Sequence, residues 1–386
     1  MTTRRIAVVT GSRAEYGALR WLLRDLQDDP RLQPQLIVTG AHLCPEFGLT
    51  VRDIEKDGFD IAETVECQLS SDSRAGMVKS LALGTMLMPD ALRRLKPHVL
   101  VAVGDRYEIL AAAQAAALLG IPIAHISGGE VTEGAVDDWI RHSITKASWW
   151  HFAAAEPYRR RIIQLGESPD RVFNVGDLAL DSIRHVTLVE REALERELDL
   201  SLQAPVFLVT FHPATLGELS PRESFGRVLA ALEQFPDARV VITKPNADAG
   251  GREMGALAER WSRQHSERSR CFSSLGQVHY LSVMKLASAV IGNTSSGIIE
   301  APLLKVPTVN IGTRQSGRLK TSSIVDCAET TEATVAAISR VLSPQFRQTL
   351  PGTQSLYGQG NACVLIRDFL AAAVLPRTLA KGFHDL

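Results

Sequence analysis

At 386 residues, the chain is too long for one ordinary hydrophobic core and predicts two domains of roughly 150 to 200 residues each. Its hydrophobic content of 45% and charged content of 22% are typical of a soluble globular protein. A formal net charge of -1 without a basic block disfavours nucleic acid as a partner. No stretch reaches the roughly 18 uninterrupted apolar residues that a membrane span needs.

The cysteines are scattered and odd in number: Cys44, Cys67, Cys271, Cys327 and Cys363. No two of them form a CxxC pair, so the sequence predicts reduced, mostly buried thiols in a cytoplasmic protein and no structural zinc site. The N-terminal run MTTRRIAVVTGSRAEYG has a short apolar stretch broken by Gly11, which is typical neither of a signal peptide nor of a membrane anchor.

Strands and helices are expected to alternate along the whole chain. In the first half the expected strands are 6–10, 35–39, 99–103, 122–126, 149–153 and 172–175. In the second half they are 206–211, 239–243, 271–273, 289–291, 306–311 and 323–325. Nearly all are continuous apolar runs, as in strands buried on both faces of a parallel sheet, and amphipathic stretches such as 14–27, 108–119 and 224–233 lie between them. This alternation predicts a doubly wound α/β fold, present twice.

The boundary between the two domains is expected near residues 187–203, which are charged, apolar at helical spacing and without a strand. The prediction is therefore an N-terminal Rossmann-like domain of residues 1–186 and a C-terminal, nucleotide-binding Rossmann-like domain of residues 187–363. Ligands of such folds bind at the carboxyl ends of the strands, which predicts an active site in an interdomain cleft.

The first expected strand is followed by TGSRAEYG, Thr10 to Gly17, which opens a helix. Two glycines without a GxGxxG pattern do not indicate a dinucleotide cofactor, although the strand-loop-helix context suits a phosphate. Arg13 at the helix N-terminus is placed to bind an anion. The alternative is a solvent-exposed arginine at a tight turn.

A carboxylate and a guanidinium, Asp105 and Arg106, follow the strand 99–103 directly in the run GDRYE. Neither charge is needed for packing at the tip of a buried strand, so both are predicted to act on a ligand. The alternative is that Asp105 only caps the following helix.

The strand 122–126 is followed by an acidic, glycine-rich loop, SGGEVTEGAVDD. Its paired glycines let backbone approach a ligand closely, and carboxylates held near one another can differ in pKa and so supply one acid and one base. Glu130 and Asp137 are the candidates. The alternative is a surface loop whose aspartates, Asp138 in particular, cap the next helix; Arg141 and His142 would then lie in that helix's first turns.

Two strands of the second half also end in polar residues. His212 follows the strand 206–211, with its backbone restricted by the next proline, and is a candidate for acid–base chemistry or phosphate contact; a capping histidine is the alternative. Lys244 and Asn246 follow the strand 239–243 and add a cation and an amide to the same edge of the sheet.

The most informative stretch is AVIGNTSSGIIEAPLLKVPTVNIGTRQSGR, residues 289–318. A buried strand delivers small hydroxyl residues and backbone N–H groups to a helix expected from Ile298, which is the arrangement of an anion site. Arg314 closes the neighbouring strand, so the two together predict a ligand that carries a diphosphate. Glu300 is expected inside the helix, where it would bind ribose hydroxyls or complement the helix dipole.

Several other chemistries lack their motifs. No GxSxG elbow indicates a serine hydrolase triad, and no HExxH or similar spacing indicates a metal site. The sequence therefore predicts neither a metal nor a cofactor.

Taken together and in order, the motifs resemble the sugar-nucleotide 2-epimerases over essentially the whole chain. The pieces that carry the resemblance are TGSRAEYG, GDRYE, GGEVTEGAVDDWIRH, FHPAT, KPNADAGG, IGNTSSGIIEAP, NIGTRQSGR and YGQGNA. The FHPAT form is similar to the hydrolysing branch, which makes precursors of sialic and legionaminic acids, whereas the non-hydrolysing branch tends to carry a HRREN-like run there. The resemblance implies a glycosyltransferase-B arrangement of the two domains, a C-terminal helix over 364–386 that packs back on the first domain, and a homodimer or higher homo-oligomer.

The resemblance also implies residue roles. Some relatives carry a glutamate immediately before the Gly-Gly pair, where this chain has Ser127, so we assign that role to Glu130, and the nucleotide base is expected beside the backbone at Leu275. The expected catalytic residues are Asp105, Glu130, Asp137 and His212. The expected substrate-binding residues are Arg13, Arg106, Lys244, Asn246, Leu275, Asn293, Thr294, Ser295, Ser296, Gly297, Glu300 and Arg314.

The implied activity is hydrolytic epimerisation of UDP-N-acetylglucosamine to N-acetylmannosamine and UDP, through elimination to a 2-acetamidoglycal and addition of water. The alternative substrate is UDP- or GDP-linked N,N'-diacetylbacillosamine, because the residues do not specify the base or the substituent at sugar C4. More distant alternatives are a non-hydrolysing epimerase, a glycosyltransferase on the same fold, and a sugar-nucleotide sensor without turnover.

Overall fold

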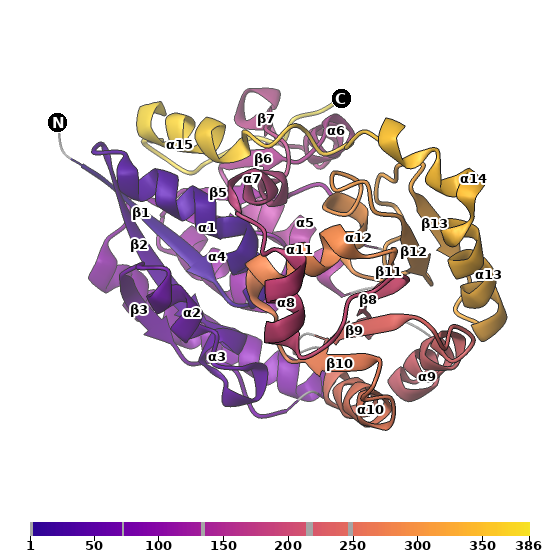
Figure 1. The fold of residues 1–386 in the computed structure, drawn as a ribbon. Helices are drawn as coiled ribbons and strands as arrows, with labels where there is room; N and C mark the ends of the chain where they lie inside the picture. Colours follow the sequence, from indigo (N-terminus) through magenta and orange to yellow (C-terminus); the bar gives the residue numbers. More distant parts are fainter. Residues whose placement is uncertain (1–2, 72, 133–135, 214–218, 246–249) are drawn as a thin grey trace. The chain divides into compact units, whose positions relative to one another are not determined.

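The computed structural model describes residues 3–71, 73–132, 136–213, 219–245 and 250–386, which divide into two compact units (Figure 1). The first unit comprises the described parts of 1–130, 136–185 and 357–386. The second comprises the described parts of 186–356 together with Val131 and Thr132. No helix in the described ranges combines the length and the apolar character that crossing a membrane would require.

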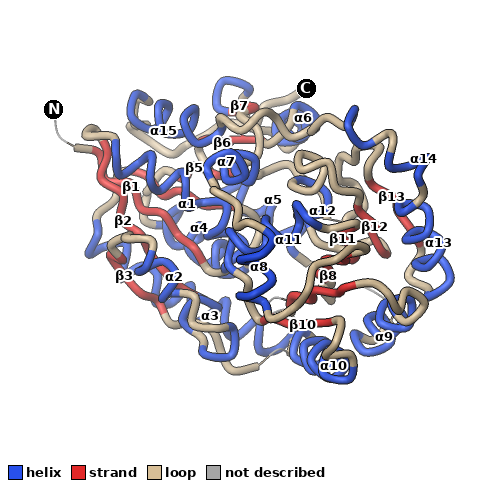
Figure 2. The backbone as a smooth tube through the Cα atoms, in the orientation of Figure 1, coloured by secondary structure: helices blue, strands red, loops and turns tan. Residues whose placement is uncertain are grey.

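The first unit is built on a parallel sheet of seven strands among its described residues, ordered β3-β2-β1-β4-β5-β6-β7. Figure 2 shows its strands in red and its helices in blue. The strands are β1 (Arg4–Thr10), β2 (Leu32–Thr39), β3 (Ile61–Val65), β4 (Val99–Val103), β5 (Ile123–Ile126), β6 (Trp150–Ala153) and β7 (Val172–Asn174). The helices are α1 (Arg13–Asp28), α2 (Val51–Lys56), α3 (Arg74–Leu95), α4 (Tyr107–Leu118), α5 (Asp137–Ala147), α6 (Glu156–Gln164), α7 (Leu178–His185) and α15 (Ala362–Ala372), with short 3₁₀ turns at Gly40–Leu43, Pro45–Phe47 and Pro169–Arg171.

Both faces of this sheet are buried, which explains its continuous apolar strands. In β1, Ile6 and Val8 pack with Leu19 of α1 and Ile366 of α15 on one face, while Ala7 and its neighbours on the other face pack with α3 and α4. Because neighbouring residues of a strand point to opposite faces, a two-sided core needs an apolar residue at every position.

The second unit carries a parallel sheet of six strands in its described residues, ordered β10-β9-β8-β11-β12-β13. The strands are β8 (Val206–Thr210), β9 (Arg239–Thr243), β10 (Ser269–Phe272), β11 (Ala289–Gly292), β12 (Thr308–Ile311) and β13 (Ile324–Cys327). The helices are α8 (Arg191–Leu198), α9 (Pro221–Leu232), α10 (Gly251–Gln264), α11 (Gly276–Leu286), α12 (Ser295–Ile299), α13 (Thr331–Leu342) and α14 (Pro344–Arg347), followed by a 3₁₀ turn at Leu350–Gly352.

Each strand expected from the sequence has a counterpart, and the α/β fold of two doubly wound units is confirmed. The sequence missed one strand, β3. It lies at the edge of its sheet, pairs only with β2, and alternates exposed and partly buried residues in IAETV before the buried Val65. The other strands were predicted from continuous apolar runs, which are typical of strands buried on both faces of a sheet. Strand β3 lacks such a run because it lies at the edge and is partly exposed.

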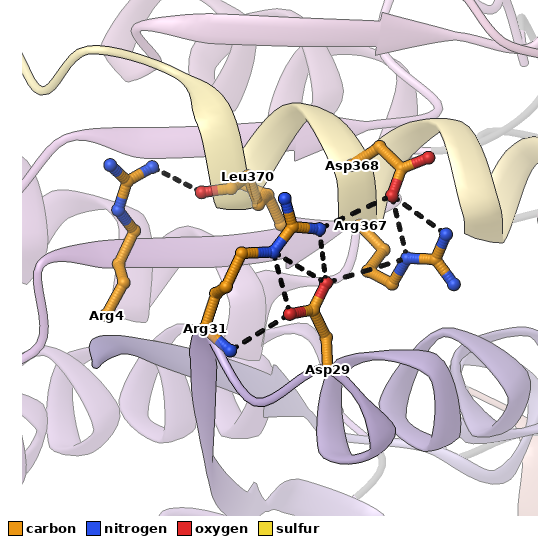
Figure 3. A network of polar contacts seen from close by, with 6 residues as sticks. All are labelled: Arg4, Asp29, Arg31, Arg367, Asp368 and Leu370. Carbon is orange, nitrogen blue, oxygen red and sulfur yellow. Dashed lines mark hydrogen bonds and ion pairs between the residues drawn. The ribbon is translucent and has the colours of Figure 1, made fainter. Parts of the chain in front are cut away.

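Helix α15 packs against α1 and α7 within the first unit, and Figure 3 shows polar contacts that its residues make there. The carboxylate of Asp29 lies 2.6 Å from Nη2 of Arg31 and 3.9 Å from Nε of Arg367, and Arg4 donates a hydrogen bond to the carbonyl oxygen of Leu370. Exposed ion pairs contribute little, about 0–1 kcal/mol each, so the buried side chains of α15 in the core supply most of the stabilisation.

The helix is shorter than the expected range of 364–386. It ends at Ala372, and residues 373–386 continue without a helix along the first unit. Pro376 explains the end, because a proline disfavours helical backbone at the residue before it and cannot donate a helix hydrogen bond.

Candidate functional site

In the first unit, the expected site residues follow three neighbouring parallel strands. Strand β1 pairs with β4, and β4 with β5, so the loops after Thr10, Val103 and Ile126 leave the same edge of the sheet. Arg13 is the first residue of α1, Asp105 lies in the loop after β4, and the acidic loop follows β5. The sheet thus gathers at one edge the polar groups that the sequence places after buried strands.

A buried arginine connects the acidic positions. Arg141 is 1% exposed and donates from Nη2 to the carboxylate of Asp105. Its Nη1 donates to the carbonyl oxygen of Glu130 at 3.0 Å and lies 3.7 Å from Oδ1 of Asp138. Two of the expected catalytic residues are therefore joined by a guanidinium that the sequence analysis placed only as part of a helix.

A sequence signal for this arginine exists. Helix α5 buries Ile140, Arg141, Ile144 and Thr145, so the arginine stands in the apolar stripe of an amphipathic helix. A charge in such a stripe needs a partner of opposite charge, because burial of an isolated charge is costly.

The capping interpretation of Asp105 is not what the structure has. Arg106 occupies the N-cap position of α4, without a side-chain cap, and Asp105 pairs with Arg141 instead. Arg106 itself is 7% exposed, with Nε 3.5 Å from Oε2 of Glu108 and its guanidinium over the ring of Tyr107. Asp105 is thus held by an ion pair and not by a helix end.

Asp137 is the first residue of α5 and is half-buried, whereas Asp138 lies beside both Arg141 and His142. Val136 stands at the N-cap position, so neither aspartate is the N-cap residue of this helix. The next expected acid, Glu130, is buried, as are Gly128 and Gly129 before it.

Two further buried carboxylates lie beside the β1 loop. Glu15 accepts hydrogen bonds from the backbone N–H groups of Gly11 and Ser12 at 2.8 and 3.1 Å. Burial raises the pKa of the Glu15 carboxyl to about 8, and the neighbouring negative charge of Glu108 adds to the shift. The side chain of Glu108 also fills the space beside Gly11. A Cβ added at Gly11 would lie 3.1 Å from the Cβ of Glu108.

The histidine at the end of β5 is a structural residue. His125 is completely buried, with Nε2 2.8 Å from the carbonyl oxygen of Gly104 and Nδ1 3.2 Å from Oγ1 of Thr145. Burial lowers the pKa of His125 to about 3, so the ring is neutral at physiological pH and stabilises the loop that precedes Asp105.

In the second unit, the expected residues again follow adjacent strands. Strand β11 pairs with β8 on one side and β12 on the other, so the loops after Thr210, Gly292 and Ile311 share one edge. These loops carry His212, the Asn293–Gly297 run and Arg314 respectively.

The amide of Asn293 ties the first two of these loops together. Its Oδ1 accepts from the backbone N–H of His212 at 2.7 Å, and its Nδ2 donates to the carbonyl oxygen of the same residue at 2.9 Å. The carbonyl oxygen of Asn293 accepts from Nη1 of Arg314 at 3.2 Å and from Nε2 of Gln315 at 2.8 Å. Asn293, which we expected to bind substrate, has its side-chain amide bonded to the backbone of His212.

The helix after β11 corrects two expectations. It begins at Ser295, three residues before the expected Ile298, and Thr294 is its N-cap, accepting from the backbone N–H of Ser296. It ends at Ile299, so Glu300 is the C-cap residue and not part of the helix interior. A carboxylate there cannot complement the helix dipole, which is negative at the C-terminus; it instead accepts a hydrogen bond from Oγ of Ser296.

Gly297 is required by close packing. A Cβ at this position would lie 2.7 Å from Cγ2 of Thr308 on the neighbouring strand. The glycine thereby lets the short helix α12 sit directly against β12, with its first turn at the strand ends.

Tyr280, to which the sequence assigned no role, lies beside the hydroxyl groups of Thr210, Thr294 and Ser296. Tyr280 of α11 has its hydroxyl 3.4 Å from Oγ1 of Thr210, and Thr294 and Ser296 also hydrogen-bond to it. Burial, followed by the charge of Glu300, raises the pKa of this phenol, so it is neutral at physiological pH. A lone tyrosine within a helix carries no motif, so only the fold reveals its place.

The remaining expected residues are less connected to this group. Lys244 forms an ion pair with Glu259 of α10. Leu275 is half-buried at the N-cap position of α11, and Asn246 lies outside the described residues.

Comparisons with known proteins agree with this architecture. A model of the UDP-N-acetylglucosamine 2-epimerase family matches residues 24–371. The GDP/UDP-N,N'-diacetylbacillosamine 2-epimerase (hydrolyzing) of Campylobacter jejuni is 42% identical over 326 residues, covering 84% of this chain and 85% of that protein. The polysialic acid biosynthesis protein P7 of Escherichia coli is 35% identical over 388 residues, covering 99% and 98% of the two chains.

A solved structure shows the same fold. The crystal structure of UDP-GlcNAc 2-epimerase from Neisseria meningitidis bound to UDP-GlcNAc superposes with a TM-score of 0.80 at 17% identity. The match covers 95% of this chain and 99% of that one.

Proposed function

The chain belongs to the UDP-N-acetylglucosamine 2-epimerase family, and from this we propose that it is a hydrolysing 2-epimerase of a nucleotide-linked N,N'-diacetylbacillosamine. The observation that carries the choice of substrate is the 42% identity, over 84% of the chain, to the relative that bears this name. The proposal therefore places nucleotide-linked N,N'-diacetylbacillosamine, which the sequence offered as the alternative substrate, ahead of UDP-N-acetylglucosamine.

The chemical difficulty is the proton on sugar C2, which is barely acidic because no carbonyl lies beside it. It becomes removable when the bond from C1 to the nucleotide breaks first or concurrently, since positive charge then develops at C1. The site must therefore stabilise the departing diphosphate. In this proposal Arg314 and the N–H and hydroxyl groups of Thr294, Ser295 and Ser296 do so, as the first turn of a helix suits an anion.

The carboxylates of the first unit would then perform the proton transfers. One takes the C2 proton to leave a 2-acetamidoglycal, and another returns a proton to the opposite face of C2 while water adds at C1. Asp105, Glu130 and Asp137 share these roles. The contacts of Arg141 with Asp105 and with the backbone of Glu130 support the proposal, because they fix two of the three groups relative to each other. The products are the free 2-epimeric sugar and the nucleoside diphosphate.

His212 is proposed to assist the leaving group. The backbone N–H and carbonyl groups of His212 both hydrogen-bond to the side-chain amide of Asn293. The carbonyl oxygen of Asn293 in turn accepts a hydrogen bond from Arg314. A histidine held there suits the balance of charge or protons as the diphosphate leaves.

A second candidate substrate is UDP-N-acetylglucosamine, which would yield N-acetylmannosamine and UDP. The relative named for polysialic acid biosynthesis favours it, since N-acetylmannosamine is the precursor of sialic acid, and it aligns over 99% of the chain. Both substrates carry a 2-acetamido group, so elimination from either would give a 2-acetamidoglycal.

The test is proton NMR of the purified protein in heavy water with a chelator, with the UDP- and GDP-linked N,N'-diacetylbacillosamines and UDP-N-acetylglucosamine in separate samples. The expected result is a free 2-epimer, deuterated at C2, from a diacetylbacillosamine nucleotide. Faster release of N-acetylmannosamine would move the chain to the second candidate. A 2-epimer still linked to its nucleotide would indicate a non-hydrolysing enzyme, and no reaction with any of the three would contradict the epimerase proposal.

A further inference from the structure

The YGQGNA motif, Tyr357 to Ala362, has no part in the proposed chemistry. The chain returns to the first unit at Tyr357, because Leu356 is the last residue of the second unit. The return is tightly fitted: the carbonyl oxygen of Tyr357 accepts from the backbone N–H of Asp177 at 2.8 Å, and a Cβ at Gly358 would lie 2.9 Å from the Cα of Gly176.

A buried carboxylate holds the end of the motif. The two oxygens of Asp181, on α7, accept from the backbone N–H groups of Ala362 and Cys363 at 3.0 and 3.2 Å. Asp181 is 1% exposed, so these bonds are shielded from water. The segment from Tyr357 to the start of α15 is thus fastened to the first unit at both of its ends.

The side chain of Tyr357 reaches helix α6. Its hydroxyl lies 3.1 Å from the hydroxyl of Tyr158, and the two ring centroids are 6.1 Å apart. Both tyrosines are essentially buried. A hydrogen bond between two buried hydroxyls restricts both rings, and the residues are 199 positions apart in the sequence.

Helix α6 in turn supports the acidic loop. Gly129 has φ +76° and lies so close to Tyr158 that an added Cβ would be 2.3 Å from the carbonyl oxygen of the tyrosine. Nη1 of Arg161, one turn further along α6, donates to the carbonyl oxygen of Gly129 at 2.5 Å. The residue before Glu130 is therefore fixed by α6 through van der Waals contact and through a hydrogen bond.

These contacts form a continuous path within the first unit, from the return segment through Tyr357, Tyr158 and α6 to the backbone of Gly129 and Glu130. We propose that Tyr357 is a positioning residue of the reaction: its bond to Tyr158 fixes α6 and thereby the backbone that carries Glu130. The expected effect on kcat rests on the proposed function. The expected effect on the backbone of Gly129 and Glu130 rests on the contacts alone.

The kinetic test compares Tyr357→Phe and Tyr158→Phe with wild type on the nucleotide sugar that wild type converts. Each change removes one hydroxyl and keeps the ring. We expect kcat to fall about tenfold, because a small displacement of a catalytic group is costly, with KM and the affinity for the nucleoside diphosphate unchanged. The double variant should be no slower than either single one, since the two hydroxyls make one bond.

The control is Tyr16→Phe. Tyr16 is also a buried tyrosine of the first unit, and its hydroxyl donates to Oδ2 of Asp57 at 2.6 Å. This variant loses a part-buried hydrogen bond to a carboxylate, so a fall in Tm at least as large, with unchanged kcat, is expected. If all three variants lost the same small amount of activity, or if the two tyrosine effects multiplied, the positioning role would be refuted.

A second readout does not depend on turnover. Backbone amide hydrogen exchange over residues 127–131 should be faster in Tyr357→Phe and Tyr158→Phe than in wild type, and unchanged in Tyr16→Phe. Should wild type convert none of the nucleotide sugars, the proposed function fails while this measurement still decides the structural link. Unchanged exchange in both variants would overturn it.

Discussion

The two units hold their functional loops by different means. In the first unit, Asp105 is held by the buried guanidinium of Arg141, so an ion pair sets the position of a candidate proton carrier. In the second unit, the side-chain amide of Asn293 holds the backbone of His212, and the side-chain amide of Gln315, together with Nη1 of Arg314, holds the carbonyl oxygen of Asn293. The difference follows from the groups that are held: a half-buried carboxylate is stabilised by a positive partner, whereas backbone N–H and carbonyl groups can be satisfied by neutral amides.

The largest expected effect is on turnover and tests the role of the Asp105 carboxylate in the first unit. Asp105→Asn should lower turnover by about 10³-fold, because an amide can neither take nor return the C2 proton. Binding of the nucleoside diphosphate should stay within about twofold of wild type, since the groups proposed to bind it lie in the second unit. Turnover is measured by NMR and binding by calorimetry. Near-normal turnover would remove Asp105 from the mechanism.

The next prediction compares how much the Arg141–Asp105 ion pair and the neutral hydrogen bond from Gln315 to Asn293 contribute to the free energy of unfolding. Arg141→Met should lower the free energy of unfolding by about 3 kcal/mol, because it removes both the charged hydrogen bond to the half-buried Asp105 and the bond to the carbonyl oxygen of Glu130. Gln315→Met in the second unit should cost only about 1 kcal/mol, the value of a neutral buried hydrogen bond. Urea denaturation of both variants checks this. Equal losses would mean that the ionic and neutral arrangements contribute alike.

The third prediction concerns the anion loop. Arg314→Gln should raise the Kd for the nucleoside diphosphate about 30-fold, the effect of losing a charged hydrogen bond. Lys320→Gln is the matched control, because Lys320 lies on the same unit but pairs with Asp326, 2.8 Å away. Calorimetric titration with UDP and GDP gives both values. A loss of the same size in Lys320→Gln would indicate a general electrostatic effect and not a contact with the ligand.

The smallest effect is a pH dependence that belongs to the first unit. The pKa of Glu15 is raised from 4.5 to about 8 in the folded protein. Its stabilising contribution is therefore complete below pH 4.5 and is lost as the pH rises towards 8. Between pH 6.5 and 8 the contribution of Glu15 to the free energy of unfolding should fall by about 1 to 2 kcal/mol.

The comparison for this prediction is Glu15→Gln, which cannot ionise and should lack the decline. The buried histidines His42 and His125, whose pKa values are lowered in the folded protein, affect both proteins alike, so the difference between the two slopes isolates Glu15. Chemical denaturation at several pH values measures the slope. The same slope in both proteins would assign the titration to another group.

The sequence predicted the positions of most strands because a strand buried on both faces must be apolar at each residue, and that pattern is local. The same reasoning located the loops that carry Asp105, Glu130, His212 and Arg314, since a polar residue directly after such a strand has no packing role. It missed β3, whose exposed edge position removes the pattern.

The sequence by itself determined the doubly wound α/β fold, the family resemblance and the loops that bear the chemistry, because periodicity and short motifs are read within a few residues. Only the tertiary structure decided which groups meet. Arg141 reaches Asp105 from 36 positions away, Asn293 reaches His212 from 81, and Tyr357 reaches Tyr158 from 199. Such contacts depend on how parallel strands and their helices are ordered in space, and spacing along the chain does not encode that order.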